Sequence, residues 1–377
     1  MITYNNIINR FYQKPSRENV ETKPFESPSH FSLCLRAILK PIILSFSDKK
    51  YREDYATQFD LASRNVEITI ETLMKLFLFH PVKNAFVLNT VGNWLHTYFK
   101  VQFETKNFEK YYVYTQHDNQ IPFYPEEDIM YTYMISQISY VANELAKIFT
   151  AKEMNYLASC FVELNNFATY THNKYQTLMP RFANHNRLTL KVIQHIDKPY
   201  NCCPSLHIAY TLLLDNVIEK FFYTNTHKQS KKKTQTFESI RYSSIRMFNS
   251  VLYTKQHSIL DVAFGMLCSH IVFEKKYKQK FNNLIYIFDD LKKDNPYINY
   301  EVIKEIYVEG MELYEKKISF YKQSHEYTNF EHLSLEGISF RETVGDYLIQ
   351  YGYPKLPIWH IINEGVYFDT VKRNLVG

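Results

Sequence analysis

Apolar side chains recur every three or four positions along most of the chain, and this spacing predicts a protein built almost entirely of helices. Within residues 51–80, for example, one helix face would carry Val66, Ile70, Leu73 and Phe77. The same spacing predicts further helices at residues 84–99, 135–149, 207–222, 238–276 (as one helix or two) and 303–318.

A capping box marks the start of another predicted helix. The side chain of Thr150 can accept a hydrogen bond from the backbone N–H of residue 153, and Glu153 can reach back to the N–H of Thr150. Leu157, Phe161 and Leu164 follow at helical spacing. We therefore expect a helix that begins directly after Thr150.

Polar stretches that contain proline divide this helical pattern. Residues 1–30 carry three prolines and indicate a loosely packed arm, whereas residues 101–127 are polar and aromatic and predict a loop with possible short strands. We expect an N-terminal arm and first helix at 1–50, a helical core at 51–280, and a C-terminal helical extension of unknown role at 281–377.

Composition indicates a globular chain and gives no sign of a membrane span. The 377 residues are 45% hydrophobic and include 32 Tyr and 28 Phe, which suffices for a sizeable core. A membrane helix needs about 18 uninterrupted apolar residues. The best candidates, residues 206–217 and 258–273, are shorter and contain acidic residues and histidines, so they predict buried helices of a soluble bundle.

The N-terminal residues lack the apolar run of a signal peptide. We therefore expect a cytoplasmic protein or, alternatively, one exported without a cleavable signal, as bacterial effectors are. The five cysteines form no C-x-x-C pair and no zinc spacing with histidine. The expectation is reduced thiols, no metal and no cofactor.

The formal net charge of +5 is too mild to indicate a nucleic-acid partner. The basic residues gather once, in a run of Asn, Thr, Gln and Ser, at Lys228, Lys231, Lys232 and Lys233. This composition predicts a solvated loop. The alternative is a peripheral contact with the anionic headgroups of a membrane.

Two short motifs carry the candidate chemistry. Ser205, which follows a proline, is a good helix N-cap, so the free N–H groups of the next turn would face an anion beside His207. His257 and Asp261 are four residues apart and would share one face of a helix. The carboxylate would then hold one imidazole nitrogen and leave the other free to act as a nucleophile.

These residues resemble the motifs of the type 2 phosphatidic acid phosphatase superfamily, which includes class A acid phosphatases, vanadium haloperoxidases and sphingolipid synthases. Its second motif reads Pro-Ser-x-His, as at 204–207, and its third ends in His, three residues, Asp, as at 257–261. The Asp-Lys-Pro-Tyr-Asn run at 197–201 and the Tyr-Thr-Lys-Gln-His run at 253–257 resemble the inositolphosphotransferase-like branch. The resemblance implies an all-α helical bundle of this superfamily.

The superfamily's first motif reads Lys, six residues, Arg-Pro. Lys174 and Arg181 have this spacing, with Phe182 in place of the proline. In the third motif the phosphate-binding arginine is replaced by Val251, and Lys255 is expected to supply a charge instead. The resemblance thus implies that Lys174, Arg181 and Lys255, together with Ser205, bind phosphate.

The resemblance also implies a mechanism, a metal-independent hydrolysis of a lipid or small-molecule phosphate ester through a covalent phosphohistidine. His257 would attack phosphorus, Asp261 would fix its tautomer, and His207 would protonate the leaving oxygen and later activate water. An ordinary, partly buried histidine capped by Asp261 is the alternative for His257, and the upstream Pro-Ser-x-His motif favours catalysis.

Three other functions remain open. A phosphotransferase that moves a phosphoalcohol headgroup between lipids matches the branch resemblance. A vanadate-dependent haloperoxidase would use the same residues, because vanadate imitates the pentacoordinate phosphoryl state. A catalytically weakened protein that only binds a phosphate ligand would account for the valine in place of the motif arginine.

Overall fold

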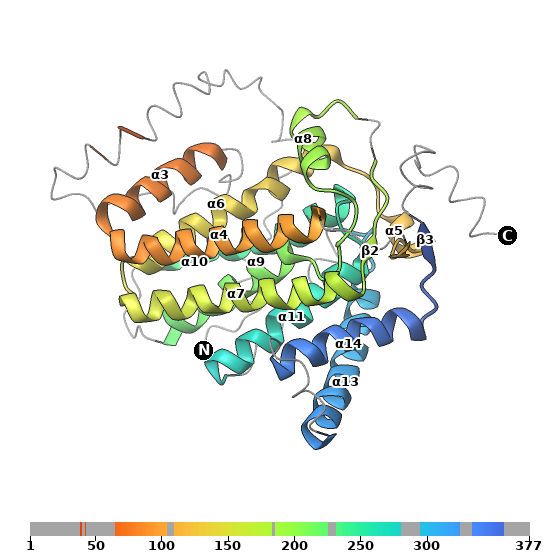
Figure 1. Cartoon of the computed structure of the whole chain (residues 1–377). Coiled ribbons are helices and arrows are strands. Elements are labelled where there is room, and N and C mark those ends of the chain that lie inside the picture. Colours follow the sequence, from red (N-terminus) through yellow and green to blue (C-terminus); the bar gives the residue numbers. More distant parts are fainter. Residues whose placement is uncertain are drawn as a thin grey trace.

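The structure is a computed structural model that describes residues 38, 39, 42, 65–103, 109–182, 185–224, 231–279, 295–324 and 334–357, with backbone only at 102–103, 222–224, 231–239, 242 and 357. Helices dominate this part of the chain (Figure 1). Within these ranges no helix is both long enough and apolar enough to span a membrane. The helices are α3 (Asn65–Phe79), α4 (Pro81–Phe103), α5 (Gln116–Gln120), α6 (Asp128–Ala146), α7 (Ala151–Lys174), α8 (Leu188–Ile196), α9 (Leu206–Thr224), α10 (Lys231–Tyr253), α11 (Ile259–Tyr277), α13 (Tyr300–Ser324) and α14 (Leu335–Gln350).

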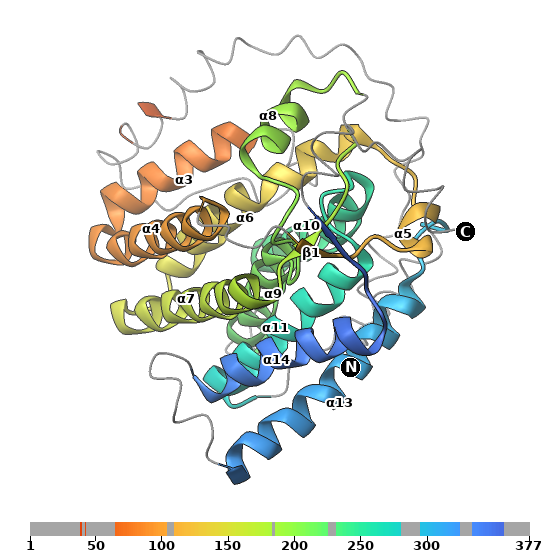
Figure 2. The ribbon, with the colours of Figure 1, turned by 45° about the vertical axis from the view of Figure 1, so that its right-hand side comes forward.

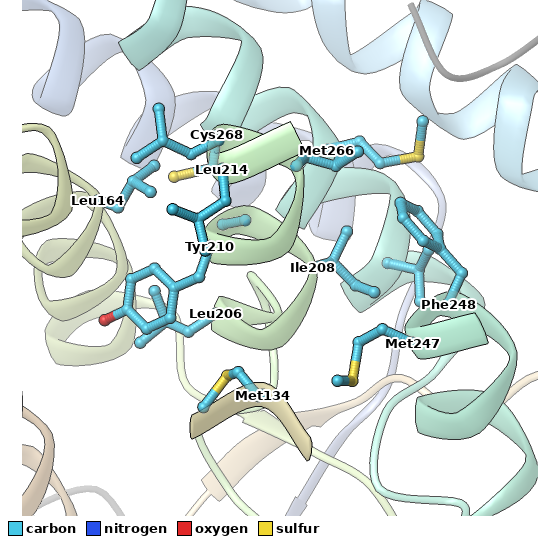
Figure 3. Close-up of a cluster of buried hydrophobic side chains, with 14 of the residues drawn as sticks. Met134, Leu164, Leu206, Ile208, Tyr210, Leu214, Met247, Phe248, Met266 and Cys268 are labelled. Atoms are coloured by element: carbon cyan, nitrogen blue, oxygen red, sulfur yellow. The ribbon is translucent and has the colours of Figure 1, made fainter. Parts of the chain in front are cut away.

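The helix α9 runs through the core, and its neighbours cover it on several sides. It packs against α6, α7, α10 and α11. Figure 3 shows side chains of α9 among those of its neighbours, with labels on Met134, Leu164, Leu206, Ile208, Tyr210, Leu214, Met247, Phe248, Met266 and Cys268. Burying one aliphatic side chain contributes about 1.5–3 kcal/mol. This packing fixes α9, whose first turn carries His207.

The predicted capping box is confirmed at the start of α7. The backbone N–H of Glu153 donates to Thr150 Oγ1 at 3.3 Å, and that of Thr150 donates to Glu153 Oε2 at 2.7 Å. The predicted apolar face of this helix is also confirmed, because Leu157, Phe161 and Leu164 are buried.

The prediction of which face of α3 is buried is wrong. Val66 and Phe77 are 54% and 59% exposed, while the opposite face, with Ile68, is buried. This buried face packs against α6 and also holds an ion pair between Lys75 and Glu71 at 2.7 Å. Apolar periodicity alone points to the wrong side here because the buried side includes charged residues that pair with each other. The part of the prediction before residue 65 lies outside the described residues.

A small sheet adds to the helical fold, which is mostly α and consistent with the expected all-α class. Its strands are β1 (Glu109–Tyr112), β2 (Thr177–Leu178) and β3 (Lys355–Pro357), in the order β2-β1-β3. β1 is parallel to β2 and antiparallel to β3. The strand β1 confirms the short strand predicted within 101–127, and α5 and a 3₁₀ turn at Pro125–Glu127 complete that stretch.

The C-terminal helices α13 and α14 share the core of the preceding helices. Ile303, Ile306 and Tyr314 of α13 are buried, as their spacing predicts. In α14, Phe340 lies beside Phe264 of α11, with ring centroids 6.3 Å apart. Figures 1 and 2 both show α13 and α14 at the opposite end of the molecule from α3 and α8. The boundary predicted at residue 281 lies outside the described residues.

Candidate active site

A cavity of about 240 Å³ lies among α4, α6, α7, α8 and the start of α9. Five of its polar lining residues, all buried or half-buried, form what we call the cavity floor: His172, Arg181, Asn201, His207 and His257. Three apolar lining residues are about half exposed, and we call them the cavity mouth: Ile135, Val192 and Ile196. Aromatic side chains of α4 and α6 also line the cavity, and we call them the aromatic wall.

His257 lies in the turn between α10 and α11 and not on a helix, which corrects the sequence-based placement. Its own N–H donates to the carbonyl of Val251 at 3.2 Å. Neighbouring residues anchor the turn: Asp118 Oδ1 accepts from the N–H of Ile259 at 2.8 Å, and the Tyr253 carbonyl accepts from the N–H of residue 124 at 3.0 Å. The turn therefore holds the imidazole in a defined position.

Asp261 approaches His257 because it belongs to a capping box. Ser258 is the N-cap of α11, and its N–H donates to Asp261 Oδ2 at 2.7 Å. The same oxygen lies 3.5 Å from Nδ1 of His257. Asp261 is fully buried, and its Oδ1 has no hydrogen-bond partner among the described residues. The predicted pairing of His257 with Asp261 is thus present, and Nδ1 faces the carboxylate. Their separation is within the range of an ion pair but too long for a good hydrogen bond.

His207 lies in the first turn of α9 and faces the same cavity. Its ring stacks on Tyr131, with centroids 4.2 Å apart, and lies 5.6 Å from the ring of His257. Burial lowers the pKa of His207 well below its usual range, and the neighbouring His257 and Arg181 lower it further. His207 is consequently a weak base in the empty cavity.

The two histidine motifs meet through a close backbone approach. The N–H of Ser205 donates to the carbonyl of Asp261 at 3.0 Å. Gly265 of α11 makes this approach possible, because a Cβ there would lie 2.7 Å from the carbonyl oxygen of Ser205. The serine side chain is fully buried, and within the described part of the chain its Oγ has no partner. The predicted side-chain cap is therefore wrong, and Ser205, a predicted phosphate ligand, is not among the residues that line the cavity.

Arg181, a predicted phosphate ligand, lines the same cavity as His207 and His257 and supplies a cation at its floor. One guanidinium nitrogen donates to the carbonyl of Gln256 at 2.8 Å, and the other lies 3.5 Å from Oδ2 of Asp197. Its Nε has no partner in the described ranges. Arg181 therefore braces the turn that carries His257 and keeps one donor free, while Asp197 offsets part of its charge.

The structure does not bring Lys255 to the cavity. Its Nζ donates to the carbonyls of Asp118 and Ile121, and the side chain is 2% exposed. Lys255 also has a left-handed φ of 53°, which non-glycine residues rarely adopt. The predicted phosphate ligand is thus an anchor that stabilises the tight turn before His257.

Lys174 does not reach the cavity either. Its Nζ lies 2.8 Å from Glu342 of α14, and its side chain is 47% exposed. Val251, which stands where the resembled motif has its arginine, is fully buried in the core and does not line the cavity. Of the basic cluster, Lys228 and the side chains of Lys231–Lys233 lie outside the described residues, although 231–233 begin α10 and do not form a loop.

Sequence reasoning missed an acidic residue that organises the floor. Asp197 accepts hydrogen bonds from the hydroxyl groups of Tyr98 on α4 and Tyr131 on α6. Burial raises the pKa of Tyr98 well above its usual range, and the nearby carboxylate of Asp197 raises it further. Both tyrosines therefore remain hydrogen-bond donors. The signal that could have indicated Asp197 is its place in the run before the Pro-Ser-x-His motif.

Three further polar residues at or beside the floor were not among the predicted site residues. His172 Nε2 and both side-chain polar atoms of Asn201 are buried and without partners among the described residues. The same holds for Nζ of Lys110 on β1, a fully buried amine 5.2 Å above the ring of Tyr200. Such atoms lose their hydration without replacement, which is unfavourable unless a ligand or water pairs with them. No local sequence pattern marks Lys110.

Comparison with known protein families, with curated proteins and with solved structures found no match to this chain. The site therefore has to be interpreted from its geometry. Two imidazoles whose centres lie 5.6 Å apart can act on one small group, because each proton or electron-pair transfer spans about 3 Å. A guanidinium and several unpaired donors surround the same space.

Proposed function

We propose that this protein hydrolyses a phosphate ester through a covalent phosphohistidine. The observation that supports the proposal best is the convergence of His257, His207 and Arg181 on one cavity, with Asp261 behind His257. These four residues come from three separate parts of the chain. A merely structural histidine pair would not require the neighbouring unpaired polar atoms.

The geometry assigns a role to each imidazole. Nδ1 of His257 is directed to Asp261, so Nε2 is the nitrogen that attacks phosphorus and forms the P–N bond. The P–O bond to the alcohol breaks, and the proton of His207 passes to the leaving oxygen. His207 then takes a proton from water, whose oxygen attacks phosphorus and releases inorganic phosphate together with free His257.

The floor also supplies charge stabilisation. The phosphoryl oxygens would accept hydrogen bonds from Nε of Arg181, which lines the cavity and is unpaired within the described residues. The amide of Asn201 lies in the same lining. A buried site with preorganised donors stabilises a developing negative charge more strongly than water does.

A panel of phosphate esters tests this function, with nitrophenyl phosphate, sugar phosphates and phosphatidic acid as substrates. We expect His257→Ala to lower kcat by about a thousandfold or more, since it removes the nucleophile. His96→Ala is the matched control, because His96 is exposed and does not line the cavity. We also expect inhibition by vanadate and full activity in a chelator. A panel without turnover, or equal activity of both variants, would refute the proposal.

Transfer to an alcohol is the second candidate. The mouth and the aromatic wall make most of the cavity lining apolar, which favours an apolar alcohol over water as the acceptor. In a reaction with phosphatidic acid and added diacylglycerol or alcohol, mass spectrometry of the products separates the two. Transfer is supported if phosphate appears on the acceptor, and hydrolysis if only inorganic phosphate is released.

A further inference from the structure

Three apolar residues belong both to the cavity and to the outer surface. Ile135 of α6 and Val192 and Ile196 of α8 line the cavity, yet they are 52%, 49% and 52% exposed. A residue can meet both conditions only where the cavity opens. The opening of the proposed active site is therefore apolar.

The exposed face of α8 extends this apolar opening. Leu188 is 75% exposed, and it stands four and eight residues before Val192 and Ile196, so the three share one face of the helix. Leu190, on another face, is fully buried. A face of this kind is unfavourable in water, and its continuity with a cavity mouth suggests an interaction surface.

The charges on α8 are of one sign. The sequence from Leu188 to Ile196 contains no acidic residue, and Lys191 and His195 are exposed beside the apolar face. Apolar residues on one side and basic residues at the border are the arrangement of a helix that lies in the interface of an anionic bilayer.

We propose that α8 is an interfacial helix that docks this protein on an anionic membrane with the cavity mouth toward the lipid. Its apolar face would enter the boundary between headgroups and acyl chains, and Lys191 would lie among the lipid phosphates. This inference rests on the proposed function only in that the cavity then receives an amphiphile directly from the bilayer. The apolar part of the substrate would never cross water.

A bilayer suits this surface better than a second copy or a peptide. The face is a convex helix with a protruding Leu188, not a groove that could receive a helix or a strand. Within residues 188–196 the border carries Lys191 and no acidic residue, so two copies that face each other through this helix would place like charges together. Both features match an anionic lipid surface.

Sedimentation of the full chain with vesicles tests the docking. With vesicles of phosphatidylcholine and phosphatidylserine, we expect Leu188→Glu to weaken binding by about tenfold or more, because a charge replaces an inserted apolar group. Phe320→Glu on α13 is the matched control: Phe320 is 51% exposed, and α13 lies at the other end of the molecule from α8 (Figures 1 and 2). This control should bind as the original chain does.

A second variant separates the electrostatic contribution. Lys191→Gln should weaken binding to the anionic vesicles by about fivefold and leave binding to pure phosphatidylcholine unchanged. The proposal is overturned if the original chain does not bind vesicles, if Leu188→Glu binds as well as Phe320→Glu, or if Leu188→Glu changes only self-association in ultracentrifugation.

The outcome for docking is distinguishable from the outcome for catalysis. His257→Ala should bind vesicles as well as the original chain, since the imidazole lies at the cavity floor and not on α8. Vesicle binding that depends on Leu188, in a chain inactive toward every phosphate ester, would support the membrane surface and refute the proposed reaction. Hydrolysis of soluble esters without vesicle binding would support the proposed reaction and refute the membrane surface.

Discussion

The floor and the mouth of the cavity differ in almost every physical property. The floor is polar and buried, and several of its atoms have no hydrogen-bond partner within the described residues. The mouth is apolar and half exposed. Folded proteins normally avoid both conditions, because unpaired buried polar atoms and contiguous exposed apolar residues are each unfavourable. Their occurrence in one cavity is what supports the proposal of a ligand with a polar, anionic end and an apolar end.

The comparison also separates chemistry from recognition. In the proposed reaction, the floor groups act on the phosphoryl group and should change kcat when altered. The mouth groups contact the part of the substrate that does not react, and should change KM more than kcat. The following predictions address the floor first and the mouth last.

The largest expected effect concerns His207. We expect His207→Ala to lower kcat by about a thousandfold for alkyl phosphates, whose leaving oxygen needs a proton, and by less than about tenfold for nitrophenyl phosphate. The measurement is kcat for both substrates. Equal losses for the two would contradict the assignment of His207 as the acid.

The same residue predicts the pH profile. An acid must be protonated in the free enzyme, and burial lowers the pKa of His207 well below its usual range. The kcat/KM value for an alkyl phosphate should therefore rise as the pH falls, with an acidic optimum, and this rise should be absent in His207→Ala. An optimum above neutral pH would argue against this role.

Lys110 tests whether the unpaired polar atoms beside the floor serve a ligand. Lys110→Met keeps the length of the side chain and removes a buried, unpaired amine, so stability should stay equal or increase. If this charge helps to hold the phosphate, kcat/KM should fall by about tenfold or more. Lys355→Met on the neighbouring strand is the control, because Lys355 is exposed. A destabilised Lys110→Met enzyme with normal kinetics would show that the amine is only structural.

Much of the fold could be predicted from sequence because helix signals are local. The capping box at Thr150 and Glu153 lies within four residues, and α7 begins where it predicts. The face of α3 could not be predicted in the same way, because its burial depends on how α6 packs against it. The sheet likewise joins strands that are far apart in the chain.

In the candidate site, too, the local motifs could be predicted from sequence and the direction of a side chain could not. His207, His257 and Asp261 form short motifs, and the structure brings them together. Lys255 lies two residues from His257 in sequence, yet its side chain points to the carbonyls of Asp118 and Ile121. The direction in which a side chain points from a tight turn depends on the backbone dihedral angles, and the spacing of a motif does not determine these angles.

His172 should make stability depend on pH. Burial lowers its pKa from 6.5 to about 3, so the folded protein keeps it neutral at pH 5 while the unfolded chain binds a proton. The stabilising difference is complete above pH 6.5 and is lost as the pH falls below it, by about 2 kcal/mol at pH 5. Denaturant titrations should show that His172→Gln loses this dependence and exposed His96→Gln keeps it. An identical pH dependence in both would mean that His172 is hydrated in the folded protein.

The smallest expected effect belongs to the mouth. Ile135→Thr replaces part of the apolar rim by a hydroxyl, and we expect KM for a long-chain phosphate to rise by about threefold to tenfold with a much smaller change in kcat. Ile129→Thr is the matched control on the same helix, because Ile129 is 41% exposed but does not line the cavity. A series of alkyl phosphates gives the measurement, since the ratio of KM values between Ile135→Thr and the original chain should grow with chain length. A ratio independent of chain length would mean that the apolar part of the substrate does not pass through the mouth, and the floor would then have to recognise the substrate by its phosphate alone.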